Sequence, residues 1–211
     1  MFDELNYFEY DIEDIEQKLK AYFKEMPEIT DEQLEERVKV GKRVFNLIML
    51  FLLMVQGSAI AQEVQDIEYY TEMLQRRYLD LVAEEYVVDD YLINYINNFA
   101  IQSVNTTIEN IDSDYYLSDD RALNMAENEA NTIVNYNDYR KAVEKGYTKK
   151  KWLSMKDAKV RKTHHLVDDK EIDIKALFHV GNSLMLFPHD TSNGADAKEI
   201  IHCRCHIKYL R

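Results

Sequence analysis

The sequence HCRCH at residues 202–206 and the sequence RKTHH at residues 161–165 mark the part of this chain that decides its fold. Both lie in residues 148–209, which contain all six histidines, both cysteines and the only tryptophan. Four short runs in this part have the apolar content or the alternation of strands: residues 151–155, 172–174, 184–188 and 203–209. We therefore predict a small α+β domain at residues 148–211.

The preceding part of the chain has the pattern of long acidic helices. Five glycines and two prolines in 211 residues favour long helices over a strand-rich fold. Thr30 and Gln33 fit a capping box, which predicts a helix start. Ser118 and Gly146 predict the two ends of a later helix. The predicted fold is mainly α with a small C-terminal α+β domain: a helical bundle or arm at residues 1–117, a linking helix at 118–147 and the α+β domain at 148–211.

An apolar run at residues 44–55 raises the question of membrane contact. A helix that spans a membrane needs roughly 20 apolar residues, and this run is shorter. It predicts a helix buried in the core or in an oligomer interface, with membrane contact as the alternative. The N-terminus is acidic at Asp3 and Glu4, where a secretory signal needs basic residues. We expect no membrane span.

Charge is divided unevenly along the chain, whose formal net charge is −13. Residues 149–211 carry 13 Lys and Arg against 8 Asp and Glu, whereas residues 1–148 carry 13 against 31. A basic end suits an anion such as DNA, or the acidic end of a second copy. The candidates for nucleic-acid contact are Lys149, Lys150, Lys151, Trp152, Lys156, Lys159 and Lys162. A solvated face, or docking on the acidic helices, explains the same run, and we expect the N-terminal helices to mediate self-association.

The two cysteines stand in a C-x-C arrangement that does not indicate a secreted disulfide framework. Free thiols or metal ligands in a reducing compartment fit better. Cys203 and Cys205, with His164 and one of His165, His202 or His206, supply the ligand types of a tetrahedral zinc site. On a flat strand, however, the alpha carbons of Cys203 and Cys205 would lie nearly 7 Å apart, which is about twice the rise per residue. Two small buried thiols are the alternative.

Arg161, His164 and Asp168 have the residue types of an acid–base set. A histidine oriented by a carboxylate, beside an arginine that binds phosphate, would suit phosphodiester cleavage, and Arg204 is a further candidate. The alternative is a buried polar network that holds the small domain together. The chain has neither a nucleophile elbow nor a P-loop, which favours the network.

An ordered series of these residues resembles the C-terminal domain of the phage Mu protein F-like family. The matching residues are Trp152, Asp157, Arg161, His164, Asp168, Phe178, Val180, Gly181, Pro188, Asp190, Glu199, Ile200, Cys203, Arg204 and Cys205, preceded by Ala126, Glu127, Glu129, Asn135 and Gly146 on the linking helix. The resemblance covers roughly residues 118–209. The chain departs from the pattern at His202, where the family usually has Asn, and at Asp169, where it often has Gly.

The resemblance implies a minor head, or head morphogenesis, protein of a phage or prophage. Such a protein would bind portal, capsid or scaffold proteins, and DNA during packaging or delivery. It would be found in the virion interior or in the cytoplasm of the bacterial host. Two alternatives stay open: a nuclease-like or toxin domain using His164, Asp168 and Arg161, and a helical adaptor protein.

Overall fold

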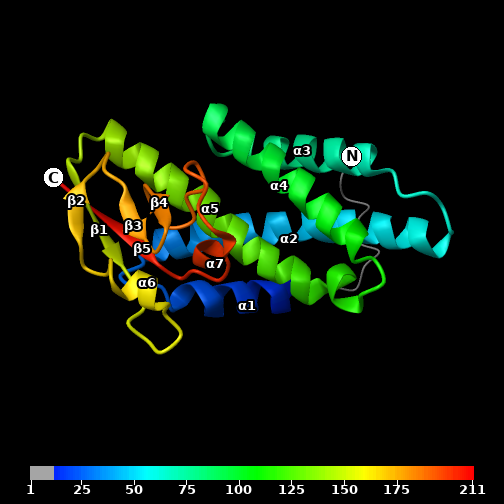
Figure 1. Cartoon of the computed structure of the whole chain (residues 1–211), viewed down its shortest axis with the longest axis horizontal. Coiled ribbons are helices and arrows are strands. Elements are labelled where there is room, and N and C mark those ends of the chain that lie inside the picture. The colour runs from blue at the N-terminus through cyan, green and yellow to red at the C-terminus, as the bar shows by residue number, and fades with distance from the viewer. Residues whose placement is uncertain (1–11) are drawn as a thin grey trace.

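The computed structural model describes residues 12–211 (Figure 1). It is mainly α with a small C-terminal region of strands, which confirms the predicted fold class. The helices are α1 (Ile12–Lys24), α2 (Asp31–Ile60), α3 (Ile67–Ala83), α4 (Asp90–Glu109), the 3-10 helix η1 (Asp114–Leu117), α5 (Asp119–Glu144), α6 (Lys162–His165) and α7 (Ala197–Ile200). The strands are β1 (Lys149–Leu153), β2 (Glu171–Asp173), β3 (Phe178–Val180), β4 (Ser183–Met185) and β5 (His206–Leu210).

Helix α2 is the central helix, and it packs against α1, α3 and chiefly α5. The capping box is present: the Thr30 hydroxyl accepts from the Gln33 backbone N–H, and the Gln33 side chain accepts from the Thr30 N–H. By length and composition, α2 is the one helix among residues 12–211 that could cross a membrane. In the most apolar 18-residue window of α2, 44% is buried inside the protein. The buried residues of the helix include Val44, Ile48 and Leu52.

Helix α5 carries an unusual number of buried polar side chains, and several of them form hydrogen bonds with α2 and with the C-terminal loops. Arg37 of α2 is fully buried and donates to the side-chain oxygens of Asn131 and Asn135. The amide of Asn135 in turn donates to the Pro188 carbonyl, 3.0 Å away. The backbone N–H of His202 donates to the Asn128 side chain at 2.8 Å. Through these bonds α5 joins α2 to the C-terminal loops.

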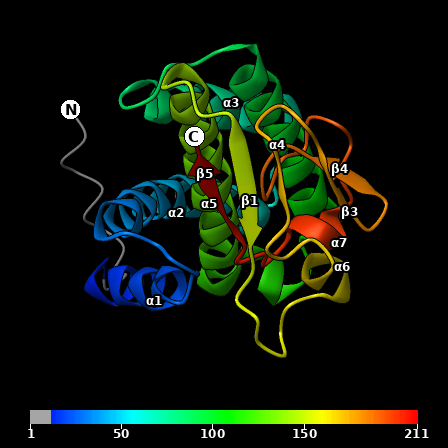
Figure 2. The same ribbon diagram turned by 90° about the vertical axis from the view of Figure 1, so that its left-hand side faces the viewer.

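The strands form two small antiparallel sheets. One has the order β2-β1-β5, and the other is the hairpin of β3 and β4. Figure 2 shows β1 and β5 side by side next to α5. Phe187, which follows β4, lies between the rings of Tyr91, Tyr136 and Tyr139 at centroid distances of 5.5 to 6.1 Å. One continuous hydrophobic cluster therefore includes buried residues of both the helices and the sheets.

One predicted strand begins later than expected. We predict a strand over residues 203–209, whereas β5 starts at His206, so the C-x-C motif lies in the loop between α7 and β5. His202 has a φ of 56°, which turns the chain just before Cys203. The Cys203 carbonyl then bonds to His189 Nε2 at 2.8 Å and to the Asn131 amide at 3.5 Å. Because side chains occupy this carbonyl, Cys203 does not enter the strand ladder.

Candidate metal centre

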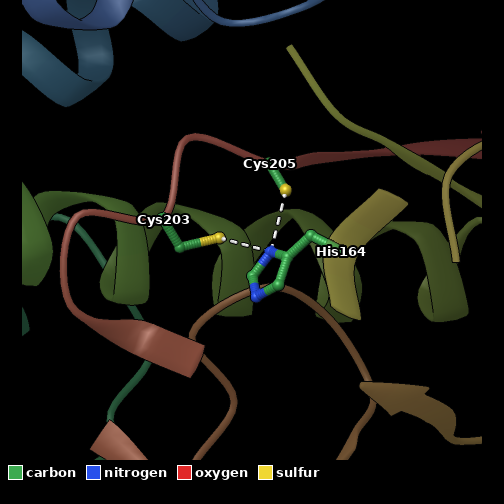
Figure 3. A group of neighbouring side chains, drawn as sticks. All are labelled: His164, Cys203 and Cys205. Carbon is green, nitrogen blue, oxygen red and sulfur yellow. Dashed lines mark hydrogen bonds between the residues drawn. The ribbon is translucent and has the colours of Figure 1, made fainter. Parts of the chain in front are cut away.

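Three buried side chains meet where α6 faces the C-x-C loop (Figure 3). The Nδ1 atom of His164 lies 3.2 Å from the sulfur of Cys205 and 3.5 Å from the sulfur of Cys203. All three ligand atoms lie within 4.8 Å of one another, and each residue is at most 3% exposed. The group could hold a metal ion.

The loop conformation brings the two sulfurs together. The expectation of a wide separation between the alpha carbons assumed a flat strand, whereas both cysteines lie in the loop before β5 and their sulfurs are within 4.8 Å of each other. The Cys203 N–H donates to the Ile200 carbonyl at 2.9 Å, which closes the turn that follows α7. The side chain of Arg161 donates to the Ile201 carbonyl in the same turn. These bonds position both thiols on the same nitrogen of His164.

The other ring nitrogen of His164 faces a buried carboxylate. Its Nε2 atom lies 3.2 Å from Glu199 Oε2, in an ion-pair contact rather than a well-formed hydrogen bond. The same carboxylate accepts from the Thr163 hydroxyl at 2.7 Å. Metal-binding histidines commonly direct the nitrogen that does not bind metal at a carboxylate, which fixes the tautomer. Glu199 occupies that position.

A glycine makes room for Glu199. Gly181 follows β3 and has a φ of 61°. A Cβ atom there would lie 2.9 Å from Glu199 Oε1 and 3.1 Å from Thr163 Cγ2. A side chain at this position would therefore have to displace the Glu199 carboxylate, and the glycine leaves it room beside His164. The FHVG sequence at residues 178–181 is thus part of the same site.

The electrostatics of the group favour one thiolate. Burial by itself raises the pKa of the Cys203 thiol, but hydrogen bonds from Cys205, His164 and His189 bring that pKa well below its ordinary value. The hydrogen bond to Cys203 and burial raise the pKa of Cys205 well above its ordinary value. Burial lowers the pKa of His164, yet the contact with Cys203 outweighs it and the net shift is upward. The thiolate is the form of cysteine that binds metals.

The other histidines proposed as ligands have different environments. His202 is exposed but lines the small cleft beside the group. His165 is exposed and outside the group. His206 is buried, its pKa is lowered to about 3 by burial and by Arg37, and it lines a separate cavity of ≈ 500 Å³ between α2, α5 and β5. His189 was not predicted from the sequence, although its ring nitrogen fixes the Cys203 carbonyl.

The predicted acid–base set is not assembled. Asp168 accepts from the Ser154 backbone N–H at 2.7 Å and lies 3.6 Å from the Lys156 ammonium. Arg204 pairs with Asp157 and Glu25, both at 2.8 Å. Arg161 bonds to a backbone carbonyl, as described above. Since the carboxylate beside His164 is Glu199 rather than Asp168, these residues have the bonds of a structural network.

The predicted nucleic-acid run is divided by the fold. Lys150 and Trp152 were wrong candidates, because both are fully buried. The Lys150 ammonium donates to the Leu186 carbonyl at 2.7 Å, and Trp152 packs edge-on against His164 and Phe178. Burial lowers the pKa of Lys150 to about 8.

The remaining lysines of the run differ in their partners. Lys149 pairs with Glu171 at 2.8 Å, and Lys156 pairs with Asp169 at 2.6 Å. Lys151 is half-buried on β1, while Lys159 is exposed before α6 and Lys162 is exposed at its first position. The surface open to an anionic partner is therefore smaller than the sequence run.

Comparison with known proteins adds no relative to this picture. No family model matches the chain, and neither the curated proteins nor the solved structures give a match.

Proposed function

We propose that this chain is a phage or prophage minor head protein that acts by binding portal, capsid or scaffold components. The observation that carries the proposal is that residues of the Mu F-like pattern, scattered between positions 126 and 205, contact one another in space. Gly181 admits Glu199, Glu199 faces His164, and His164 meets both cysteines. A pattern whose members support one another is expected of a domain signature.

Other members of the pattern hold the loops around this group. Asp157 accepts from Arg204 and from the backbone N–H groups of Lys159 and Val160. Asp190 is fully buried and accepts from the backbone N–H groups of Leu186 and Ser192. Trp152 and Phe178 stack edge to face at 5.2 Å. These contacts support a binding module with a specified fold rather than an active site.

The two departures from the pattern also have a physical explanation. Asp169, which replaces a frequent Gly, has a φ of 59°, and His202, which replaces a usual Asn, has a φ of 56°. Glycine and asparagine adopt this left-handed conformation most readily, and Asp and His are also enriched there among other residues. The backbone therefore keeps the conformation that the pattern's residues favour.

Zinc is the metal that fits the buried group best. Two sulfurs and one imidazole nitrogen are its usual ligands, at about 2.3 and 2.0–2.1 Å from the metal. In a tetrahedron with those bond lengths, sulfur and nitrogen would lie about 3.5 Å apart. The observed separations of 3.2 and 3.5 Å are close to this value. Bound zinc would tie α6 to the loop before β5.

The test of the head-protein proposal is co-assembly. The tagged chain is expressed together with the portal, scaffold and major capsid proteins encoded on the same genome, and the particles are separated by sedimentation. We expect the chain in purified particles and in portal complexes recovered through its tag. A chain that stays with free protein and recovers no portal, capsid or scaffold protein would contradict the proposal and favour the adaptor alternative.

The test of the zinc centre is removal of the metal. A chelator should lower the melting temperature by about 5–10 °C, because the C-terminal loop loses its anchor and each kcal/mol corresponds to about 2–4 °C in a chain of this size. Adding zinc back should restore the melting temperature, whereas calcium should not. The same chelator should leave a Cys203→Ser/Cys205→Ser protein unaffected. An equal response of that double variant would place the bound metal elsewhere.

A further inference from the structure

We infer that the metal has one coordination position open to solvent, and that this position exchanges water for small anions. The inference rests on the proposed metal centre. It goes further, because a purely structural zinc site has four protein ligands, whereas an open site has three and one exchangeable ligand.

The first observation is the number of donors. Among residues 12–211, the group of ligand atoms around this point has three members, His164, Cys203 and Cys205. Glu199 is not a fourth, because it faces the opposite nitrogen of the imidazole ring. Figure 3 shows both sulfurs directed at one edge of the ring, with the second nitrogen turned away from them.

The second observation is a cleft at the same place. Its volume is ≈ 10 Å³, and it is lined by all three ligand residues together with Met155, Lys159, Val160, Arg161, His202 and Arg204. A space of this size holds about one water molecule. The position left free by the three donors therefore adjoins a space for one ligand atom, which solvent can supply.

The third observation is charge. Lys159, Arg161 and Arg204 line the cleft, and none of the described residues that line it is Asp or Glu. Metal binding requires both cysteines as thiolates, which together neutralise a divalent metal. Arg204 is already paired with Asp157 and Glu25, so Lys159 and Arg161 are the cations left to attract a negative ligand. The fitting ligand class is a small anion, or one terminal oxygen of a phosphate group whose remainder stays in solvent. Binding is a simple exchange: the anion donates a lone pair to the metal and neutral water departs.

His202 is the competing fourth ligand. It lines the cleft, but its ring nitrogens are not among the atoms that gather within 4.8 Å. Its backbone N–H is fixed by Asn128 at 2.8 Å, and its φ of 56° anchors the turn. Coordination by His202 would require its side chain to swing inward and close the position to anions.

Cobalt substitution distinguishes these cases. Co²⁺ is added to metal-free protein, and its absorption is recorded during titration with azide and, separately, with inorganic phosphate. We expect a thiolate-to-cobalt band in the near ultraviolet and strong visible bands of four-coordinate cobalt. Azide should shift the visible bands saturably while the thiolate band remains. Phosphate, being larger, should shift them at higher concentration.

Each outcome has a definite meaning. Absence of the thiolate band, in protein with unchanged helical circular dichroism, would overturn the metal centre and this inference with it. A thiolate band with visible bands that neither anion moves would overturn the inference alone. If His202→Ala then gained a response to azide, His202 would be the fourth ligand.

A matched pair of variants tests the role of the cleft charge. Lys159→Gln removes a cation that lines the cleft, and it should raise the azide concentration at half-saturation about fivefold. Lys175→Gln removes an exposed cation from the turn after β2, and it should leave that concentration unchanged. Equal behaviour of the two variants would contradict a cationic cleft.

Discussion

At the scale of single residues, Gly181 shows how the absence of a side chain leaves room for the Glu199 carboxylate. Two glycines of the C-terminal part have similar left-handed backbones, with φ values of 61° at Gly181 and 69° at Gly194. A Cβ atom at Gly181 would collide with Glu199, while one at Gly194 would meet nothing within 4 Å. The pair therefore separates backbone strain from steric collision.

Gly181→Ala should destabilise the protein more than Gly194→Ala does. Both substitutions carry a left-handed strain of about 1 kcal/mol, and Gly181→Ala must in addition displace Glu199, at about 1–2 kcal/mol more. Chemical denaturation measures the difference in the free energy of unfolding. Equal losses would show that Glu199 moves aside without consequence and does not fix His164.

The raised pKa of the buried Glu129 carboxyl predicts that the stability of the protein depends on pH. Its carboxylate accepts from the hydroxyls of Tyr78 and Tyr95 at 2.8 and 2.7 Å, and burial raises its pKa from 4.5 to about 7. Between these values the folded protein retains a proton that the unfolded chain releases. The contribution of Glu129 to the free energy of unfolding is therefore fully present below about pH 4.5 and is lost as the pH rises through about 7.

Glu129→Gln should remove that dependence. The amide keeps both tyrosine contacts, since a hydroxyl can accept as well as donate. We expect the variant to match the parent near pH 5 and to exceed its free energy of unfolding by about 1–3 kcal/mol at pH 8. Glu127, whose pKa burial also raises to about 7, provides a second substitution of the same sign. A variant that is less stable than the parent at pH 8 would contradict this.

At the scale of elements, the sequence predicted helices better than strands. The capping box at Thr30 and the Ser118 start were found because caps act through local backbone bonds. The start of β5 was missed because the turn at His202 depends on bonds from distant side chains, Asn131 and His189, to the Cys203 carbonyl. No local signal distinguishes that loop from a strand.

The basic run illustrates the same limit. Alternation along β1 places Lys150 and Trp152 inside, yet a lysine in a run of lysines gives no sign of burial. The Lys150 ammonium donates to the Leu186 carbonyl and lies 5.4 Å from the ring centroids of Tyr139 and Phe178. All three partners are distant from Lys150 in the sequence, and only the fold brings them to it.

If the exposed Lys159 and Lys162 contact DNA, their removal should change the salt dependence of DNA binding. Lys159→Ala/Lys162→Ala should weaken binding and reduce the slope of log K against log salt by about 2. Lys149→Ala/Lys156→Ala, which removes two lysines already paired with carboxylates, should change the slope less. Fluorescence anisotropy at several salt concentrations gives the slopes. Identical slopes for all three proteins would remove DNA as a partner of this surface.

At the scale of the whole molecule, the C-terminal part is attached to the helices through polar and apolar contacts together. Arg37, Asn131 and Asn135 connect α2 and α5 to the loops that carry Pro188 and Cys203.

The sequence predicted the cysteines, His164 and His202 as metal candidates from residue type. It could not select among the four histidines, because the choice depends on how α6 and the C-x-C loop meet.

The most direct test of this account is the metal content of the protein as purified from cells. We predict close to one zinc per chain by elemental analysis, and loss of that zinc in His164→Ala and in Cys203→Ser/Cys205→Ser. His165→Ala, which changes the exposed neighbour of His164, should retain it. A parent protein free of zinc that also takes up none when zinc is added, or variants that bind as much as the parent, would contradict a metal centre at His164, Cys203 and Cys205.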